Sequence, residues 1–192
     1  SSDTSTWKIT IEKHPGRSDI PSQKMHIDIC SIPSFDIQNR PIMDHYRINS
    51  LMSGLPIPVQ SMEEILADKM VAFAYRERRI KPRDIWDIVW LKQQGIEQAP
   101  RMVMQKLEAR GKLVENFCTK ITKHALLIEN DLATKQDFHQ EMGRFLPLDV
   151  AERTVNLEVF WPYLSNVINE EVQRLNQALN NQEQGDTFTM KM

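Results

Sequence analysis

The sequence lacks the features that would place it in several large classes of protein. Its 192 residues contain only two cysteines, Cys30 and Cys118, so it has no disulfide framework and suits the reducing cytoplasm. It shows no secretory signal and no apolar run long enough to span a bilayer, so we expect no membrane association. The net charge of −2 at pH 7 gives no global field that attracts nucleic acid. Any nucleic-acid binding therefore needs a local patch.

The composition is that of a soluble globular protein, with 41% hydrophobic and 26% charged residues. The length is sufficient for one ordinary domain or two small ones. The chain begins with serine, and a strand pattern starts at Trp7, so we expect it to be a fragment.

Two segments near the amino terminus alternate apolar and polar residues, which predicts half-buried strands over residues 7–12 and 24–30. In the second strand, Lys24, His26, Asp28 and Cys30 share one face. The carboxylate of Asp28 is a hard oxygen ligand that suits magnesium, although a solvated sheet face explains the same pattern. The histidines show no zinc-ligand spacing.

The rest of the chain is predicted to be mainly helical. Four prolines make residues 31–60 mostly irregular, with a short strand near 57–60. Ser61 and Glu64 form a capping-box pattern that starts a helix over 62–78. A second helix, over 84–94, is dense in apolar side chains, ends at Gly95 and is expected to be buried on most sides. Further helices are predicted over 100–110, 112–129, 134–142, 148–154 and 155–182.

Lys69 is the first candidate for chemistry on these helices. It lies on the same side of its helix as Phe73 and Arg76, at offsets of four and three residues. At the border of the apolar stripe, its amine would be partly desolvated and would hold triphosphate oxygens. A lysine that covers core atoms with its aliphatic stem is the alternative.

Asp84 and Asp87 are three residues apart at the start of the next helix, so they face the same way. Either carboxylate could pair with Lys69 or Arg83 and fix it for phosphate contact, or could orient an attacking hydroxyl. Asp84 also complements the positive end of the helix dipole. A purely structural ion-pair network is the alternative.

A basic turn joins the two helices and contains Arg76, Arg78, Arg79, Lys81 and Arg83, with only Glu77 opposing them. This local patch could hold nucleotide phosphates or an RNA backbone. A solvated turn without a ligand explains it equally well.

Taken together, residues 59–95 resemble the signature of the AbiEii/AbiGii family of nucleotidyltransferase toxins. That signature is an EEILA-x-K helix, a basic spacer, and R-D-[LI]-[YW]-D-[LI] at the start of the next helix. The matching positions are Glu63, Glu64, Ile65, Leu66, Ala67, Lys69, Arg83, Asp84, Trp86 and Asp87. The preceding KMHIDIC resembles the inner strand of the family, with Lys24 and Asp28 in place.

The resemblance implies an α+β fold in which a nucleotidyltransferase-like sheet is followed by a mainly helical domain. It implies Mg²⁺-dependent transfer of a nucleotide from an NTP to an acceptor, which in some relatives is the end of a tRNA, and a cognate antitoxin. Lys69, with Arg76, Arg83 and Lys24, would bind phosphate. Asp84 and Asp87 would support catalysis, and Asp28 would lie near the metal.

The family's Gly-Ser motif and Asp-x-Asp pair, expected before Trp7, do not occur in the 192 residues. Those aspartates hold the metal, so this polypeptide alone is expected to be inactive. We predict that residues 1–95 form the distal part of the nucleotidyltransferase-like domain and 96–192 a helical domain. The intact protein would transfer nucleotides to RNA or protein. The alternative is a non-catalytic module that binds RNA or a protein partner.

Overall fold

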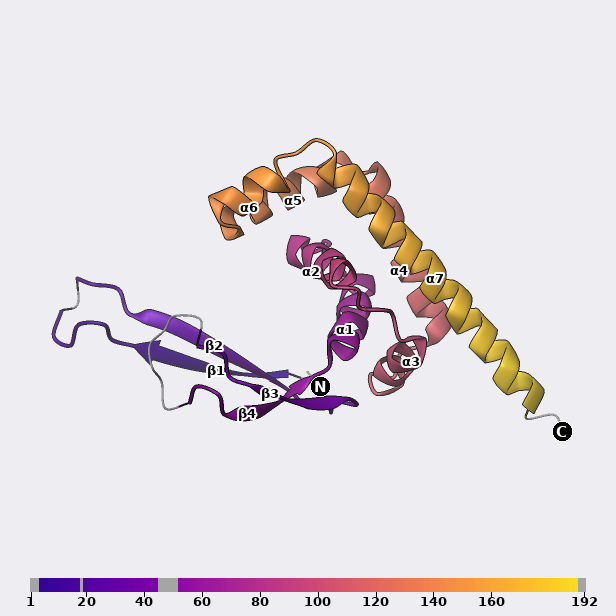
Figure 1. Ribbon diagram of the computed structural model, residues 1–192, viewed down its shortest axis with the longest axis horizontal. Helices are drawn as coiled ribbons and strands as arrows, with labels where there is room; N and C mark the ends of the chain where they lie inside the picture. Colours follow the sequence, from indigo (N-terminus) through magenta and orange to yellow (C-terminus); the bar gives the residue numbers. More distant parts are fainter. Residues whose placement is uncertain (1–3, 18, 45–51, 190–192) are drawn as a thin grey trace. The chain divides into compact units, whose positions relative to one another are not determined.

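The computed structural model describes residues 4–17, 19–44 and 52–189, with the backbone alone for residues 182–189. The chain divides into two compact units, residues 1–34 and 35–192. Two small antiparallel sheets and a series of helices give the predicted α+β fold (Figure 1).

The first unit contains a β-hairpin, in which β1 (Thr4–Ile11) pairs antiparallel with β2 (Gln23–Cys30). Trp7 lies opposite Ile27 and Thr6 opposite Asp28, so the alternation separates an apolar face from a polar face, as predicted. The prediction that the strands are half-buried is wrong, because every residue of both strands is exposed. Burial of a ribbon face requires a packed layer, and the described part of this unit supplies none.

The second unit starts with another hairpin, of which the sequence predicts only one strand. β3 (Ile37–Pro41) pairs antiparallel with β4 (Pro56–Gln60), and Pro41 lies opposite Pro56. The expected short strand is therefore β4, whereas β3 lies in a segment predicted to be irregular. A proline at a strand terminus is compatible with pairing, since an edge strand does not need every backbone donor.

Seven helices follow in the described part of the second unit. They are α1 (Met62–Ala74), α2 (Pro82–Gln93), α3 (Pro100–Glu108), α4 (Val114–Asn130), α5 (Leu132–Phe145), α6 (Leu148–Arg153) and α7 (Phe160–Thr189). None of them is long and apolar enough to cross a membrane.

The helix boundaries correct several predictions by a few residues. α1 ends at Ala74 rather than at 78, because the chain turns there and buries Ile80. α2 starts at Pro82, since proline lacks the N–H that the first helical position leaves unpaired. α5 starts at Leu132, because Asp131 caps it in place of the expected start signal at Thr134. α7 starts at Phe160 rather than at 155.

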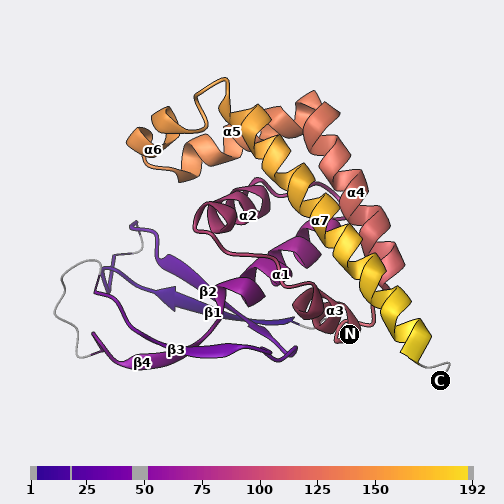
Figure 2. The same cartoon turned by 45° about the vertical axis from the view of Figure 1, so that its right-hand side comes forward.

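One hydrophobic core joins the helices of the second unit. α1 packs against α2, α3 and α4, and α4 runs beside α7 (Figure 2). The core includes Met70 and Phe73 from α1, Ile121 from α4 and Ile168 from α7. Helices on both sides of residue 95 contribute to it, and the domain boundary expected there stays a prediction.

The prediction that α2 is buried on most sides is wrong for its tryptophans. Ile85 and Ile88 are fully buried, but Trp90 is 42% exposed and Trp86 is half-buried. Gly95 ends the helix as predicted, with a φ of 77° that favours glycine.

Candidate functional site

The helix that carries Lys69 starts as the sequence predicts. The hydroxyl of Ser61 accepts a hydrogen bond of 3.1 Å from the backbone N–H of Glu64. Leu66, Met70 and Phe73 then form a fully buried stripe at helical spacing. Lys69 follows Asp68 at the border of this stripe, and its side chain is 30% exposed. Its ammonium group is therefore partly desolvated and still open to solvent.

The structure brings Lys69 together with both aspartates of α2. The Nζ atom of Lys69 lies 2.6 Å from Oδ2 of Asp87 and 3.7 Å from Oδ1 of Asp84. Arg76 donates from Nε to Oδ2 of Asp84 at 2.7 Å. We call these four residues the lysine cluster. The charges of its two cations and two carboxylates cancel, so the cluster has no net charge. The ion pairs hold its cations in fixed positions.

Asp84 is the anchor of the lysine cluster. Its side chain is only 6% exposed and contacts both cations, whereas that of Asp87 is 39% exposed. Asp84 also lies in the first turn of α2, where the helix dipole favours a negative charge. Burial of this carboxylate is tolerated because Lys69, Arg76 and the helix terminus all compensate its charge.

Arg83 lies outside the lysine cluster. Its guanidinium lies over the ring of Phe145, 4.7 Å from the ring centre, and its Nε is 3.4 Å from Oε1 of Glu141. Of the two predicted partners of Asp84 and Asp87, Lys69 pairs with both aspartates, whereas Arg83 pairs with Glu141. The guanidinium beside Asp84 is that of Arg76 instead of Arg83.

The basic turn is opposed by more acidic groups than the sequence indicated. Arg79 pairs with Asp137 and with Glu141 of α5, the latter at 2.9 Å. The expectation that Glu77 alone opposes the turn is thus wrong. The error arose because α5 is about sixty positions further along the chain, and only tertiary packing brings it to the turn.

Lys24 and Asp28 lie on the polar face of β2, in the first unit. The hydroxyl of Thr6 donates to Oδ1 of Asp28 at 2.6 Å, and Lys24 lies opposite Thr10. β2 pairs only with β1 among the described residues, so the structure does not show it as an inner strand. The roles expected for Lys24 and Asp28 stay predictions.

The described residues gather no larger cluster of metal-ligating side chains. They contain no group of three or more His, Cys, Asp or Glu side chains that could hold a metal ion. Ammonium and guanidinium groups already contact both oxygens of Asp84 and one oxygen of Asp87. We therefore assign no metal ligand in the second unit.

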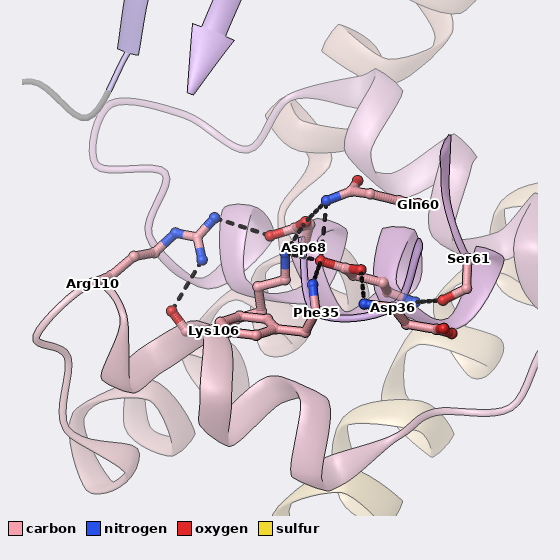
Figure 3. A network of polar contacts seen from close by, with 8 residues as sticks. Phe35, Asp36, Gln60, Ser61, Asp68, Lys106 and Arg110 are labelled. Atoms are coloured by element: carbon pink, nitrogen blue, oxygen red, sulfur yellow. Dashed lines mark hydrogen bonds and ion pairs between the residues drawn. The ribbon is translucent and has the colours of Figure 1, made fainter. Parts of the chain in front are cut away.

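A second charged network was not predicted from the sequence, and Figure 3 shows it from close by. Its centre is the fully buried Glu64, whose carboxylate accepts the backbone N–H groups of Phe35 at 2.9 Å and Asp36 at 2.7 Å. Lys106 of α3 lies 2.5 Å from Glu64 and 2.9 Å from Asp68. We call this the glutamate network, and it ties the segment before β3 to α1 and α3.

The capping-box interpretation of Glu64 is therefore only half right. Ser61 does cap α1, but its own N–H donates to the carbonyl of Asp36 rather than to Glu64. One signal for the glutamate network was present in the sequence. Lys106 stands three residues after Val103 and beside Leu107, which places a lysine on the buried face of its helix.

The electrostatics of Glu64 follow from these contacts. Burial by itself would raise the pKa of its carboxyl group. The ammonium of Lys106 and the two backbone donors outweigh burial and hold this pKa below its ordinary value. Glu64 is therefore ionised in the folded state and fully hydrogen-bonded.

Comparison with known families decides the classification. The model of the nucleotidyl transferase AbiEii toxin family, of type IV toxin–antitoxin systems, matches residues 1–180. The chain belongs to this family. Neither a curated protein nor a solved structure matches it. In this AbiEii family member, the motif residues Lys69, Asp84 and Asp87 belong to the lysine cluster and Glu64 belongs to the glutamate network, whereas Arg83 lies outside both.

Proposed function

We propose that this AbiEii family member is part of a nucleotidyltransferase toxin and that the lysine cluster binds the triphosphate of an NTP. The observation that supports this most is the arrangement of Lys69 and Arg76 around Asp84. Two cations about one-third exposed are held on one buried carboxylate, so the protein keeps them in position before a ligand binds. Preorganised cations of this kind suit the charge that develops during phosphoryl transfer.

Both cations keep donors for a ligand. An ammonium has three N–H donors, and Lys69 directs at most two of them to the aspartates. Arg76 uses Nε for Asp84 and makes no other ion pair among the residues that the structure describes, so its terminal nitrogens remain available. A triphosphate can therefore bind without breaking the contacts of Asp84.

Asp87 is the group in the lysine cluster that would face the acceptor. It is the more exposed carboxylate, and its contact with Lys69 through Oδ2 leaves the other oxygen able to accept a hydrogen bond. We propose that it orients or deprotonates the attacking hydroxyl of an RNA, such as the end of a tRNA, or of a protein acceptor. Asp84 would position Lys69 and Arg76.

The transfer step itself needs more than these residues supply. We propose that Mg²⁺ is held by the Gly-Ser and Asp-x-Asp motif of the family, which the 192 residues do not contain. We therefore expect this polypeptide alone to bind NTP without efficient transfer. Membership of a type IV toxin–antitoxin family supports a cognate antitoxin as the protein partner, and we propose a cytoplasmic location.

Lys69→Met should weaken NTP binding about tenfold or more, because one hydrogen-bonded charge contact with the triphosphate is worth about 1.5–3 kcal/mol. Isothermal titration of the 192-residue protein with each of the four ribonucleoside triphosphates would measure this. Methionine keeps the length of the aliphatic stem, so the apolar packing of the side chain should survive.

Lys120→Met is the matched control, since this exposed lysine on α4 lies outside the lysine cluster. It should bind NTP like the unmodified protein. Equal affinity of the Lys69→Met protein and this control would reject the proposed triphosphate site.

A non-catalytic module that binds RNA or a protein partner is the second candidate function. The observation in its favour is that Arg78 and Lys81 of the basic turn are exposed and make no ion pair in the described part of the chain, so the turn keeps cations for a partner. It predicts no NTP binding at the lysine cluster, so the same titration separates the two candidates.

A further inference from the structure

We propose that a cleft beside the basic turn is a second anion site, which binds a phosphate group. The cleft lies between the turn at residues 76–80, α4 and the start of α5, and has a volume of about 370 Å³. We call it the turn cleft. All of its walls belong to the second unit. The proposal does not depend on the lysine cluster, which shares only Arg76 with the turn cleft.

Two cations at the turn cleft are free to meet a ligand. Arg78 comes from the turn and Lys123 from α4, and both side chains are exposed. Neither makes an ion pair with any residue in the described part of the chain, in contrast to Arg76 and Arg79. Long basic side chains on two different elements can close on an anion from two directions.

Two of the three acidic side chains that line the turn cleft already have partners within the protein. Asp137 pairs with Arg79. Asp131 caps α5, accepting the hydroxyl of Thr134 at 2.6 Å and its N–H at 3.0 Å, and these bonds lower the pKa of its carboxyl group. Of the acids that line the cleft in the described residues, only Glu77 lacks such a partner. The two free cations therefore outnumber it.

His124 is a third polar group that lines the turn cleft, and its ring is held in a fixed orientation. Its Nδ1 lies 2.7 Å from the carbonyl oxygen of Phe73. A carbonyl only accepts, so we infer that Nδ1 carries a proton and donates to it. The ring is also held edge-on to the ring of Phe73, with the two centres 5.6 Å apart. Nε2 remains as the second ring nitrogen.

These three groups fit a phosphate better than a carboxylate. A phosphate presents three or more acceptor oxygens in different directions, so it can meet the guanidinium of Arg78 and the ammonium of Lys123 at once while it lies beside the ring of His124. The volume of the turn cleft suits a phosphate with a small attached group and is too small for a folded nucleic acid. The phosphate can belong to a small molecule or to the end of an oligonucleotide.

Pyrophosphate is the probe for the first test. Titration should shift the NMR signals of the His124 ring in the 192-residue protein. The double variant Arg78→Gln, Lys123→Gln should weaken that binding about tenfold or more, because two charged contacts are removed. Both side chains are exposed, so folding should be unaffected. An oligoribonucleotide with a 5′-phosphate and the same oligomer without it then distinguish the two sources of phosphate.

The matched control is Arg101→Gln, Lys120→Gln, which removes the same charges at exposed sites outside the turn cleft. It should bind pyrophosphate like the unmodified protein. Loss of the His124 response in the control as well would show a general charge effect and overturn the proposal. Binding that survives the cleft variant but is lost in Lys69→Met would place the anion at the lysine cluster, which also overturns it.

Discussion

Glu64→Gln should lower the free energy of unfolding by about 3–5 kcal/mol, the range for a buried ion pair that loses one partner. The side chain of Glu64 is fully buried, and its carboxylate receives two backbone N–H groups and the ammonium of Lys106. An amide of the same shape cannot compensate the charge of Lys106, which is 2% exposed and would keep Asp68 as its one carboxylate partner among the described residues. Denaturant unfolding followed by circular dichroism measures the loss.

Two further variants separate the ion pair from general disruption of the helix. Glu63→Gln changes the adjacent glutamate, which is half-buried, and should cost less than about 0.5 kcal/mol. Glu64→Gln combined with Lys106→Met should recover part of the loss, because the uncompensated charge is then gone. Additive losses in the double variant would contradict the central place of this pair in the glutamate network.

The pH dependence of stability supplies an independent check. Because the folded-state pKa of Glu64 is lowered, its contribution is complete above the ordinary glutamate pKa of about 4.3. The contribution is lost as the pH falls below that value, through the lower folded-state pKa. The Glu64→Gln protein has no titratable group at position 64. Its free energy of unfolding should therefore fall less than that of the unmodified protein over the same pH range.

Asp84→Asn should lower the free energy of unfolding by about 2 kcal/mol, while Asp87→Asn should cost less than about 1 kcal/mol. The first change leaves Lys69 and Arg76 without the buried carboxylate that both contact. The loss is below that at Glu64, because these cations are about one-third exposed and water compensates part of their charge. Asp87 is more exposed, and its one ion pair in the described part of the chain is with Lys69.

Both variants change one aspartate on the same helix to its amide, so each serves as the control of the other. Thermal or denaturant unfolding under identical conditions gives the comparison. Equal losses would show that Asp84 is not the anchor of the lysine cluster and that Lys69 and Arg76 are held by other contacts.

Local patterns were sufficient to predict much of the fold. Ser61 and the apolar stripe of α1 predicted where that helix lies, and Gly95 predicted the end of α2. Helix caps and helical periodicity depend on only a few neighbouring residues, so they can be recognised in the sequence. β3 was missed because its short segment ends in proline and pairs with a strand that follows a long connection. Its pairing partner, rather than its own composition, makes it a strand.

The candidate site was predictable to the extent that its contacts are local. Lys69, Arg76, Asp84 and Asp87 fall within nineteen consecutive positions of α1, the basic turn and α2, and the motif already grouped Lys69 with Asp84 and Asp87. The contacts of Arg79 and Lys106 depend on α5 and α3 instead. Such long-range pairs are fixed by packing of the whole core, and no spacing rule reveals them.

The central claim is that the lysine cluster holds the triphosphate of an NTP, and affinity labelling tests it most directly. An acyl-phosphate derivative of ATP transfers its acyl group to a lysine amine that lies beside the bound phosphates. Mass spectrometry of the digested 192-residue protein then identifies the acylated lysine. The account predicts that Lys69 is the main labelled residue and that unmodified ATP protects it. Labelling spread evenly over the exposed lysines, or unaffected by ATP, would contradict the account.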